Sequence, residues 1–261
     1  MRFAVQENLV SGGSLAEKAQ HLAEWGYEGV ELRGERLAER TAEIRTALAD
    51  SGVKAAAICG GYKFGLLFPE PAEREQSRNE IRRLLELAPE VGSCGVIVVP
   101  IFGPPRLPDM SPWRTAAQAE EELLVEQLAD LAEFAGRHRT QVILEPLNRY
   151  ETHYLRRLDQ AAAICRRVAS PHMTILADFF HMNIEEARIG EAIRTAGART
   201  GYVHLADSNR VVPGGGHIDF REGFAALRAI DYRGWMSLEC HVPGDAASSL
   251  RETLAFMRAQ M

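Results

Sequence analysis

The chain has 261 residues, a length that suits one (β/α)8 barrel of about 250 residues and on its own also allows two domains. Hydrophobic residues make up 46% and charged residues 25%, so a large core can form without a disulfide or a structural metal. A net charge of −6 argues against a nucleic-acid partner, and no apolar run is long enough to predict a membrane span.

Short apolar runs that read as buried parallel strands alternate with helical patterns along the whole chain. These runs are rich in Val, Ile and Leu and apolar on both faces. The eight predicted strands are Phe3–Gln6, Gly29–Leu32, Val53–Ile58, Gly95–Val99, Gln141–Glu145, Met173–Asp178, Tyr202–Leu205 and Trp235–Glu239. The alternation predicts a single (β/α)8 TIM barrel domain over residues 1–261, with a doubly wound open sheet as the alternative.

The helices between these strands carry end signals. Ser14 and Glu17 form an S-x-x-E capping box before the first helix, and glycines stop the first and second helices at Gly26 and Gly52. The other well-marked helices are predicted at Ala72–Val91, at Ala116–Ala135 followed by Gly136, and from Ala246 to the C-terminus.

Two connections that follow strands are long, Cys59–Pro71 and Pro100–Arg114. Loops of this length usually bind ligands or act as lids, and both should overhang the carboxyl end of the barrel. Their aromatic residues are Tyr62, Phe64, Phe68, Phe102 and Trp113. These residues fit a half-apolar substrate pocket, and simple capping of the barrel mouth explains them equally well.

The four cysteines show no C-x-x-C spacing and read as reduced, buried thiols; they are Cys59, Cys94, Cys165 and Cys240. The N-terminus does not resemble a signal peptide. Together these features predict a cytoplasmic protein.

Four successive predicted strands in the second half of the chain each carry, at or next to the carboxyl end, a side chain that can bind a metal. Glu145, Asp178, His204 and Glu239 are 33, 26 and 35 residues apart, about one strand and one helix at each step. In a parallel barrel all four would face one point at the end where such barrels build active sites. Three carboxylates and an imidazole favour one divalent metal, Mn²⁺, Co²⁺ or Mg²⁺, with Zn²⁺ as a further candidate. Taken singly, Glu145 also suits a salt bridge within the barrel, Asp178 a helix N-cap and His204 a core histidine.

Further polar residues, Glu151, His181 and Arg210, follow the same strand ends. A site with a metal, spare carboxylates and a guanidinium can hold a polyhydroxylated ligand. The metal would polarise a carbonyl as a Lewis acid, while one carboxylate removes the neighbouring proton and a second returns it.

Four sequence blocks resemble the xylose isomerase-like TIM barrel superfamily, and within it the ketose 3-epimerases of the D-tagatose/D-psicose type. The blocks are E-P-L-N-R-Y-E, D-F-F-H-M-N-I-E-E, H-L-A-D-S-N-R with P-G-G-G-H-I-D-F, and S-L-E-C. The resemblance implies that Glu145, Asp178, His204 and Glu239 bind the metal. It also implies that Glu145 and Glu239 are the acid/base pair on opposite faces of the sugar C3. Glu151, His181 and Arg210 would hold the O1, O2 and carbonyl end of the ketose.

The chain departs from the family pattern at Phe179, where Thr is common, and at Arg156-Arg157, where Asn-Thr is common. The arginine pair fits either a phosphate or carboxylate of the substrate or a solvated helix start. These departures leave the exact sugar open.

Three further residues near the predicted site are Glu31, Asp219 and His217. Glu31 could point into the site or towards the barrel bottom or solvent. Asp219 is predicted to be a helix N-cap, and His217, after a glycine run, could touch the substrate. The glycines do not match a phosphate-binding loop.

The predicted function is a metal-dependent sugar epimerase or isomerase that acts on a small-molecule sugar or 2-oxo polyol, and homo-oligomers are allowed. Inosose dehydratase and hydroxypyruvate isomerase are alternatives on the same metal site. An apurinic endonuclease is more remote, because the third and fourth strands end in Cys59-Gly60-Gly61 and Pro100-Ile101 and supply no histidine. A non-catalytic sugar-binding protein would not need all four ligands.

Overall fold

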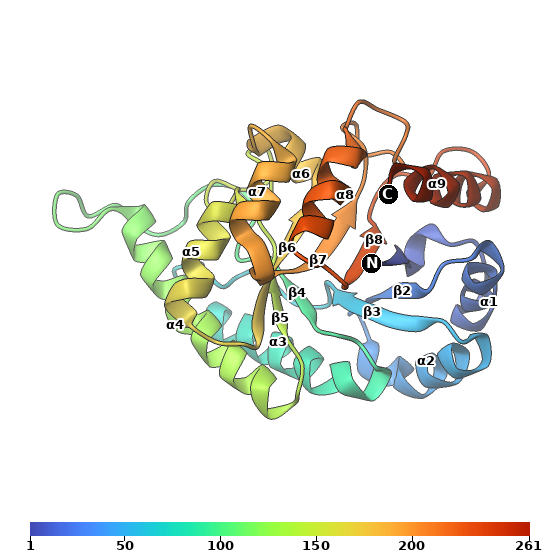
Figure 1. The fold of residues 1–261 in the computed structure, drawn as a ribbon. Coiled ribbons are helices and arrows are strands. Elements are labelled where there is room, and N and C mark those ends of the chain that lie inside the picture. The colour runs from blue at the N-terminus through green and yellow to red at the C-terminus, as the bar shows by residue number, and fades with distance from the viewer.

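A computed structural model describes residues 1–261, and its eight parallel strands pair in sequence order into a closed barrel (Figure 1). The strands are β1 (Arg2–Gln6), β2 (Gly29–Arg33), β3 (Lys54–Cys59), β4 (Val96–Val98), β5 (Val142–Leu144), β6 (Met173–Asp178), β7 (Thr200–Leu205) and β8 (Trp235–Leu238). The TIM barrel prediction is therefore confirmed, and the open-sheet alternative is wrong. The short first strand closes the barrel, because β1 pairs with both β2 and β8.

Helices form the outer layer around the barrel (Figure 1). They are α1 (Leu15–Trp25), α2 (Leu37–Ser51), α3 (Pro71–Val91), α4 (Ala116–Arg137), α5 (Leu158–Val168), α6 (Phe179–Glu185), α7 (Ile189–Ala196), α8 (Phe220–Ala229) and α9 (Ala246–Gln260), with the 3-10 turns η1 (Glu7–Leu9) and η2 (Gly197–Arg199). The apolar faces of the helices and strands meet in one large core cluster, and a smaller cluster fills the barrel interior. None of the helices combines the length and apolar character that crossing a bilayer requires.

The predicted helix signals mostly act as expected. The Ser14 hydroxyl accepts from the Glu17 amide, while the Glu17 side chain accepts from the Gly13 amide rather than from the Ser14 amide. Gly26 and Gly52 both cap their helices in the left-handed conformation, with φ of 86° and 77°.

The predicted end of the fourth helix is wrong by two residues. Helix α4 continues through Gly136 to Arg137. A methyl group at Gly136 would lie 2.9 Å from a ring carbon of His172, so this glycine allows close packing and does not stop the helix. Arg139 takes the left-handed conformation after the helix instead, with φ of 55°.

Candidate metal and sugar site

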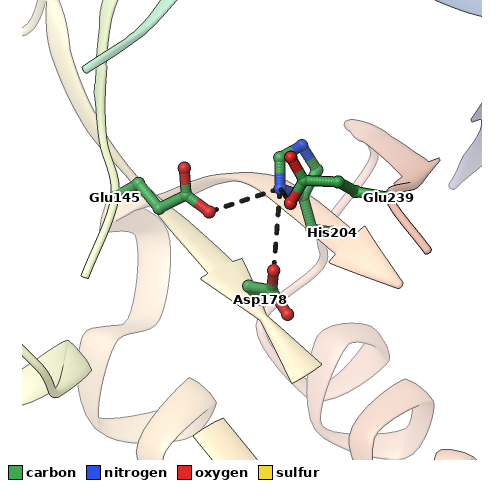
Figure 2. A group of neighbouring side chains, drawn as sticks. All are labelled: Glu145, Asp178, His204 and Glu239. Atoms are coloured by element: carbon green, nitrogen blue, oxygen red, sulfur yellow. Dashed lines mark ion pairs between the residues drawn. The ribbon is translucent and has the colours of Figure 1, made fainter. Parts of the chain in front are cut away.

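Four side chains from consecutive strand ends converge at the carboxyl end of the barrel (Figure 2). Glu145 directly follows β5, Asp178 ends β6, His204 lies in β7 and Glu239 directly follows β8. One ligand atom from each residue lies within 4.8 Å of the ligand atoms of the other three. The parallel strands thus bring together all four residues that the sequence spacing singled out.

The cluster contains two buried polar atoms that have no hydrogen-bond partner, Glu145 Oε1 and His204 Nδ1. Nδ1 lies 3.3 Å from Glu145 Oε1 and 3.1 Å from Glu239 Oε2. Leaving such atoms unsatisfied costs about 1–3 kcal/mol each. A divalent cation would satisfy both, and carboxylate oxygens with one imidazole nitrogen are ligands that Mn²⁺ and Zn²⁺ accept. The residues therefore fit a single divalent metal.

Glu31 orients the histidine of this cluster. Its Oε2 atom lies 2.9 Å from His204 Nε2 and accepts from the Tyr202 hydroxyl at 2.7 Å. Gln6 Nε2 donates to Glu31 Oε1 and to Glu239 Oε1, both at 2.8 Å. Because Glu31 accepts at both oxygens, His204 Nε2 carries a hydrogen, which leaves Nδ1 as the ring nitrogen that can bind a cation among the carboxylates. Of the two interpretations of Glu31, the inward-pointing one is correct.

The site favours positive charge at its centre. Burial would lower the pKa of His204, but Glu31 and Glu239 outweigh burial and raise the pKa well above its ordinary value. Burial raises the pKa of Glu145, against the opposing effect of His204. Burial would also raise the pKa of Asp178 and of Glu239. Nearby positive groups, chiefly Arg210 for Asp178 and His204 for Glu239, hold both pKa values below the ordinary range.

Asp178 has two roles in the structure. Its Oδ1 atom caps α6 by accepting from the Phe180 amide at 2.7 Å and the His181 amide at 3.3 Å. Its Oδ2 atom accepts from Arg210 Nη1 at 2.7 Å. Oδ1 therefore serves the helix cap, while Oδ2, which lies 3.8 Å from His204 Nδ1, is the oxygen that faces the cluster.

Arg210 lies over the cluster and also donates from Nη2 to Glu239 Oε2. Its guanidinium carbon lies 4.5 Å from the ring centroid of Phe180. The residue has φ of 61°, a left-handed conformation that is costly for a side chain of this size. Backbone hydrogen bonds hold it there, from Arg210 N to Asp207 O at 2.9 Å and from His241 N to Arg210 O at 2.6 Å.

Asn148 links the other two predicted substrate residues. Its backbone amide donates to His181 Nδ1 at 3.2 Å, and its side-chain Nδ2 lies 2.8 Å from the same atom and 2.9 Å from Glu151 Oε1. Because Nδ1 accepts, His181 Nε2 carries the hydrogen. This nitrogen lies 3.6 Å from Asp178 Oδ2, on the side of the metal cluster. His181 can therefore donate a hydrogen bond to a ligand oxygen.

The predicted catalytic and substrate residues surround a cavity of about 190 Å³. Pockets for drug-sized ligands begin at about 300 Å³, so this cavity suits a smaller ligand. Its lining includes Glu145, Glu151, His181, Arg210 and Glu239. A wider groove of about 770 Å³ lies between α2 and α3 beside the amino end of β3, and none of these residues lines it.

Aromatic residues form one wall of the cavity. Tyr62 and Phe64 have ring centroids 4.7 Å apart, and Phe64 meets Phe102 edge-on at 4.8 Å. The pocket interpretation therefore holds for these three aromatic residues. Phe68 does not line the cavity, and Trp113 is 75% exposed on the loop between β4 and α4 that projects from the barrel (Figure 1).

The arginine pair 156-157 lies outside the cavity lining. Arg157 precedes α5 and forms a two-point ion pair with Asp159, with distances of 3.0 and 2.9 Å. Arg156 lies 3.9 Å from Glu185. The solvated helix start is thus the interpretation that the structure supports.

The glycine run after β7 has a structural role. The Asp207 carboxylate accepts from the amides of Ser208, Gly214 and Ile218 at 2.7, 2.8 and 3.1 Å, which folds the loop around one side chain. Asp219 caps α8 as predicted. His217 contacts the Ser208 hydroxyl at 2.9 Å and does not line the cavity. All four cysteines are free, as expected, although only Cys165 is fully buried.

The sequence interpretation missed four residues around the site, Gln6, Arg33, Glu35 and Asn148. Gln6 ends β1, and Asn148 lies inside the E-P-L-N-R-Y-E block. A polar residue at the end of an apolar strand is the signal that could have identified Gln6. Arg33 stands two residues after Glu31 and so faces the same side of β2.

Comparison with known proteins finds epimerases along nearly the whole chain. The chain is 32% identical over 261 residues to 3-dehydro-D-guloside 4-epimerase of Escherichia coli (strain K12), covering 99% of both proteins. It is 31% identical over 218 residues to the ketose 3-epimerase of Arthrobacter globiformis, covering 82% of this chain and 73% of the relative. The crystal structure of 3-keto-D-glucoside 4-epimerase from E. coli matches with a TM-score of 0.91 and 32% identity, covering 99% of both chains.

A family model described as xylose isomerase-like TIM barrel matches residues 19–260. This range includes every residue of the metal cluster and every predicted substrate residue. The closed barrel, the strand-end cluster and the full-length relatives agree with that match. The chain belongs to the xylose isomerase-like TIM barrel family.

Proposed function

We propose that this protein is a divalent-metal-dependent epimerase that inverts the hydroxyl-bearing carbon next to the ketone of a sugar. The observation that carries the proposal is the shared cluster of Glu145, Glu239 and two further metal-type ligands at one end of the barrel. Two carboxylates that reach the same point from β5 and β8 can serve the two faces of one carbon. Full-length similarity to a sugar epimerase supports the proposal.

Glu145 and Glu239 have the catalytic roles in this proposal. One carboxylate accepts the proton from the carbon next to the ketone, and the other delivers a proton to the opposite face of the planar cis-enediolate. When bound, the cation supplies Lewis-acid polarisation of the ketone and stabilises the negative charge that develops. Glu31 and Gln6 position His204 and Glu239 through the hydrogen bonds described above.

Glu151, His181 and Arg210 hold the ketone end of the sugar. His181 Nε2 and the Arg210 guanidinium donate hydrogen bonds to substrate oxygens, while the Glu151 carboxylate accepts from a hydroxyl. Asn148 keeps the His181 ring and Glu151 in place. These roles agree with the position of all three residues in the cavity lining.

Two substrate classes share this chemistry. The motif resemblance favours C3 of a 2-ketose. The relative that aligns over 99% of both chains is named a 3-dehydro-D-guloside 4-epimerase, which favours C4 of a 3-keto-glycoside as the second candidate. In both classes the inverted carbon bears a hydroxyl and neighbours a ketone.

The cavity has no unpaired arginine to bind the carboxylate of a small acidic substrate such as hydroxypyruvate. Arg33 and Arg210 are the two arginines of the cavity lining, and each is already paired with a carboxylate. The described residues form one cluster of metal-type ligands, without a histidine from the loops after β3 or β4. That arrangement disfavours the apurinic endonuclease alternative. The dehydratase alternative predicts a different product from the epimerase, because a dehydratase removes water from the substrate.

The remaining properties complete the proposal. The metal is Mn²⁺, Co²⁺ or Mg²⁺, with Zn²⁺ as the fourth candidate. Residues 1–261 form one domain of a cytoplasmic enzyme without a nucleic-acid or membrane partner.

Metal reconstitution of chelator-treated protein tests the proposal. Each of the four cations is added separately, and 2-ketoses and methyl 3-keto-α-D-glucoside are followed by NMR for a new epimer. We expect reversible formation of an epimer at the carbon next to the ketone with at least one cation. Irreversible loss of water from the substrate would identify the protein as a dehydratase. Movement of the carbonyl to C1 would identify it as an aldose–ketose isomerase.

A further inference from the structure

Arg33 is the cavity's second arginine and has no role in the proposed reaction. It ends β2, two residues after Glu31, so both side chains project on the same side of the strand. Glu31 is fully buried, whereas the Arg33 side chain is 38% exposed at the barrel mouth. In the closed eight-strand barrel, β2 stands opposite β6, the strand that precedes His181. Arg33 therefore lines the side of the cavity away from the ketone-binding residues.

Glu35 holds the Arg33 guanidinium in a defined orientation. Arg33 Nη2 donates to Glu35 Oε1 at 2.8 Å, and Nε donates to Oε2 at 3.2 Å. The pair packs over Gly60, where a methyl group would lie 3.0 Å from Glu35 Oε1 and 3.2 Å from Arg33 Nη2. Gly34 in turn lies against Gly60, and its amide donates to Cys59 O at 3.0 Å. Close contact between the β2 and β3 loops thus makes room for the pair.

We propose that the Arg33–Glu35 pair binds the hydroxyl groups of the substrate that lie beyond the reacting carbon. Both side chains line the cavity. A guanidinium and a carboxylate side by side present several donors and acceptors with no net charge, which matches a neutral diol. This inference rests on the proposed function, because it assumes that the ketone end lies at Glu151, His181 and Arg210.

The Arg157–Asp159 pair supplies a matched comparison within the same chain. It has the same two-residue spacing and the same two-point contact. Its side chains are 45% and 52% exposed, close to the 38% and 54% of Arg33 and Glu35. The difference is location, since Arg157 and Asp159 do not line the cavity. Arg157→Met therefore controls for the loss of an exposed ion pair.

The test compares Arg33→Met, Arg157→Met and the unaltered enzyme on substrates of increasing size. The probes are dihydroxyacetone, D-ribulose, D-fructose and methyl 3-keto-α-D-glucoside, with Mn²⁺ added. The readout is kcat/KM for deuterium exchange from D₂O at the carbon next to the ketone. We expect Arg33→Met to lose about 10–100-fold on the largest substrate that the enzyme accepts, the scale of hydrogen bonds to a charged group. The loss should shrink as hydroxyl-bearing carbons are removed, while Arg157→Met follows the unaltered enzyme.

An equal loss on every substrate, or no loss on any, would overturn the inference and leave the proposed function standing. Absence of exchange by the unaltered enzyme on all four probes would overturn both. Thermal unfolding of each variant shows whether the fold is kept. If Arg33→Met does not fold, kcat/KM is measured for Glu35→Gln on the same four probes, and we expect the same dependence on substrate size.

Discussion

Glu31 Oε2 lies 2.9 Å from His204 Nε2, and this contact decides which nitrogen of the histidine faces the metal cluster. Both residues are fully buried in the barrel interior. Without the carboxylate behind it, the imidazole could adopt the other tautomer and turn a hydrogen towards Glu145 and Glu239. Carboxylates behind metal-binding histidines commonly act in this way.

Glu31→Gln should weaken the binding of Mn²⁺ by about 10–100-fold, the usual effect of losing such a partner. An amide offers one acceptor oxygen where Gln6, Tyr202 and His204 now share two. Titration of the metal-free protein with Mn²⁺, followed by electron paramagnetic resonance, measures the affinity. An unchanged dissociation constant in the folded variant would mean that Glu31 does not support the metal site.

The unaltered protein, prepared without chelator, should contain about one divalent ion per chain, as a single four-residue cluster implies. The double variant Asp178→Ala/His204→Ala should contain none, because it loses two of the four ligands. Loss of the Asp178 cap on α6 should also lower the free energy of unfolding by about 0.5–2 kcal/mol. Elemental analysis together with denaturant unfolding separates the two effects. Equal metal content in both proteins is the result that rules out this site.

Glu145→Gln and Glu239→Gln should each reduce turnover by roughly 10²–10⁴-fold, because an amide cannot accept the proton that the reaction removes. Both residues are also proposed metal ligands, so metal content is measured on the same samples. Turnover is then compared at equal occupancy. Full activity of either variant with metal bound would contradict the two-glutamate scheme.

The sequence predicted the barrel and the metal cluster because both depend on regular spacing. Each strand was a short apolar run, and in four successive runs a metal-type side chain at or next to the last residue marked the carboxyl end of the sheet. Glu145, Asp178, His204 and Glu239 follow from that rule alone, since parallel strands carry their ends to one place.

Residues whose partners are remote in the chain could not be predicted in this way. Gln6 contacts Glu239 across 233 positions, and no local pattern records that pairing. The helix end predicted at Gly136 was wrong for a similar reason. This glycine is needed for close packing against His172, which lies in a different part of the chain. Arg33 and Glu35 carry no local sequence signal for binding, and only the closed barrel places them at the cavity.

Deuterium exchange tests the central claim most directly. The Mn²⁺-loaded protein is incubated in D₂O with 2-ketoses and with methyl 3-keto-α-D-glucoside, and NMR locates the label in recovered substrate and product. We expect deuterium at the hydroxyl-bearing carbon next to the ketone, C3 of a 2-ketose or C4 of the 3-keto-glycoside, and a roughly 10²–10⁴-fold slower formation of the labelled epimer after Glu145→Gln. No exchange at any carbon, together with cleavage of abasic DNA by the same protein, would contradict the account.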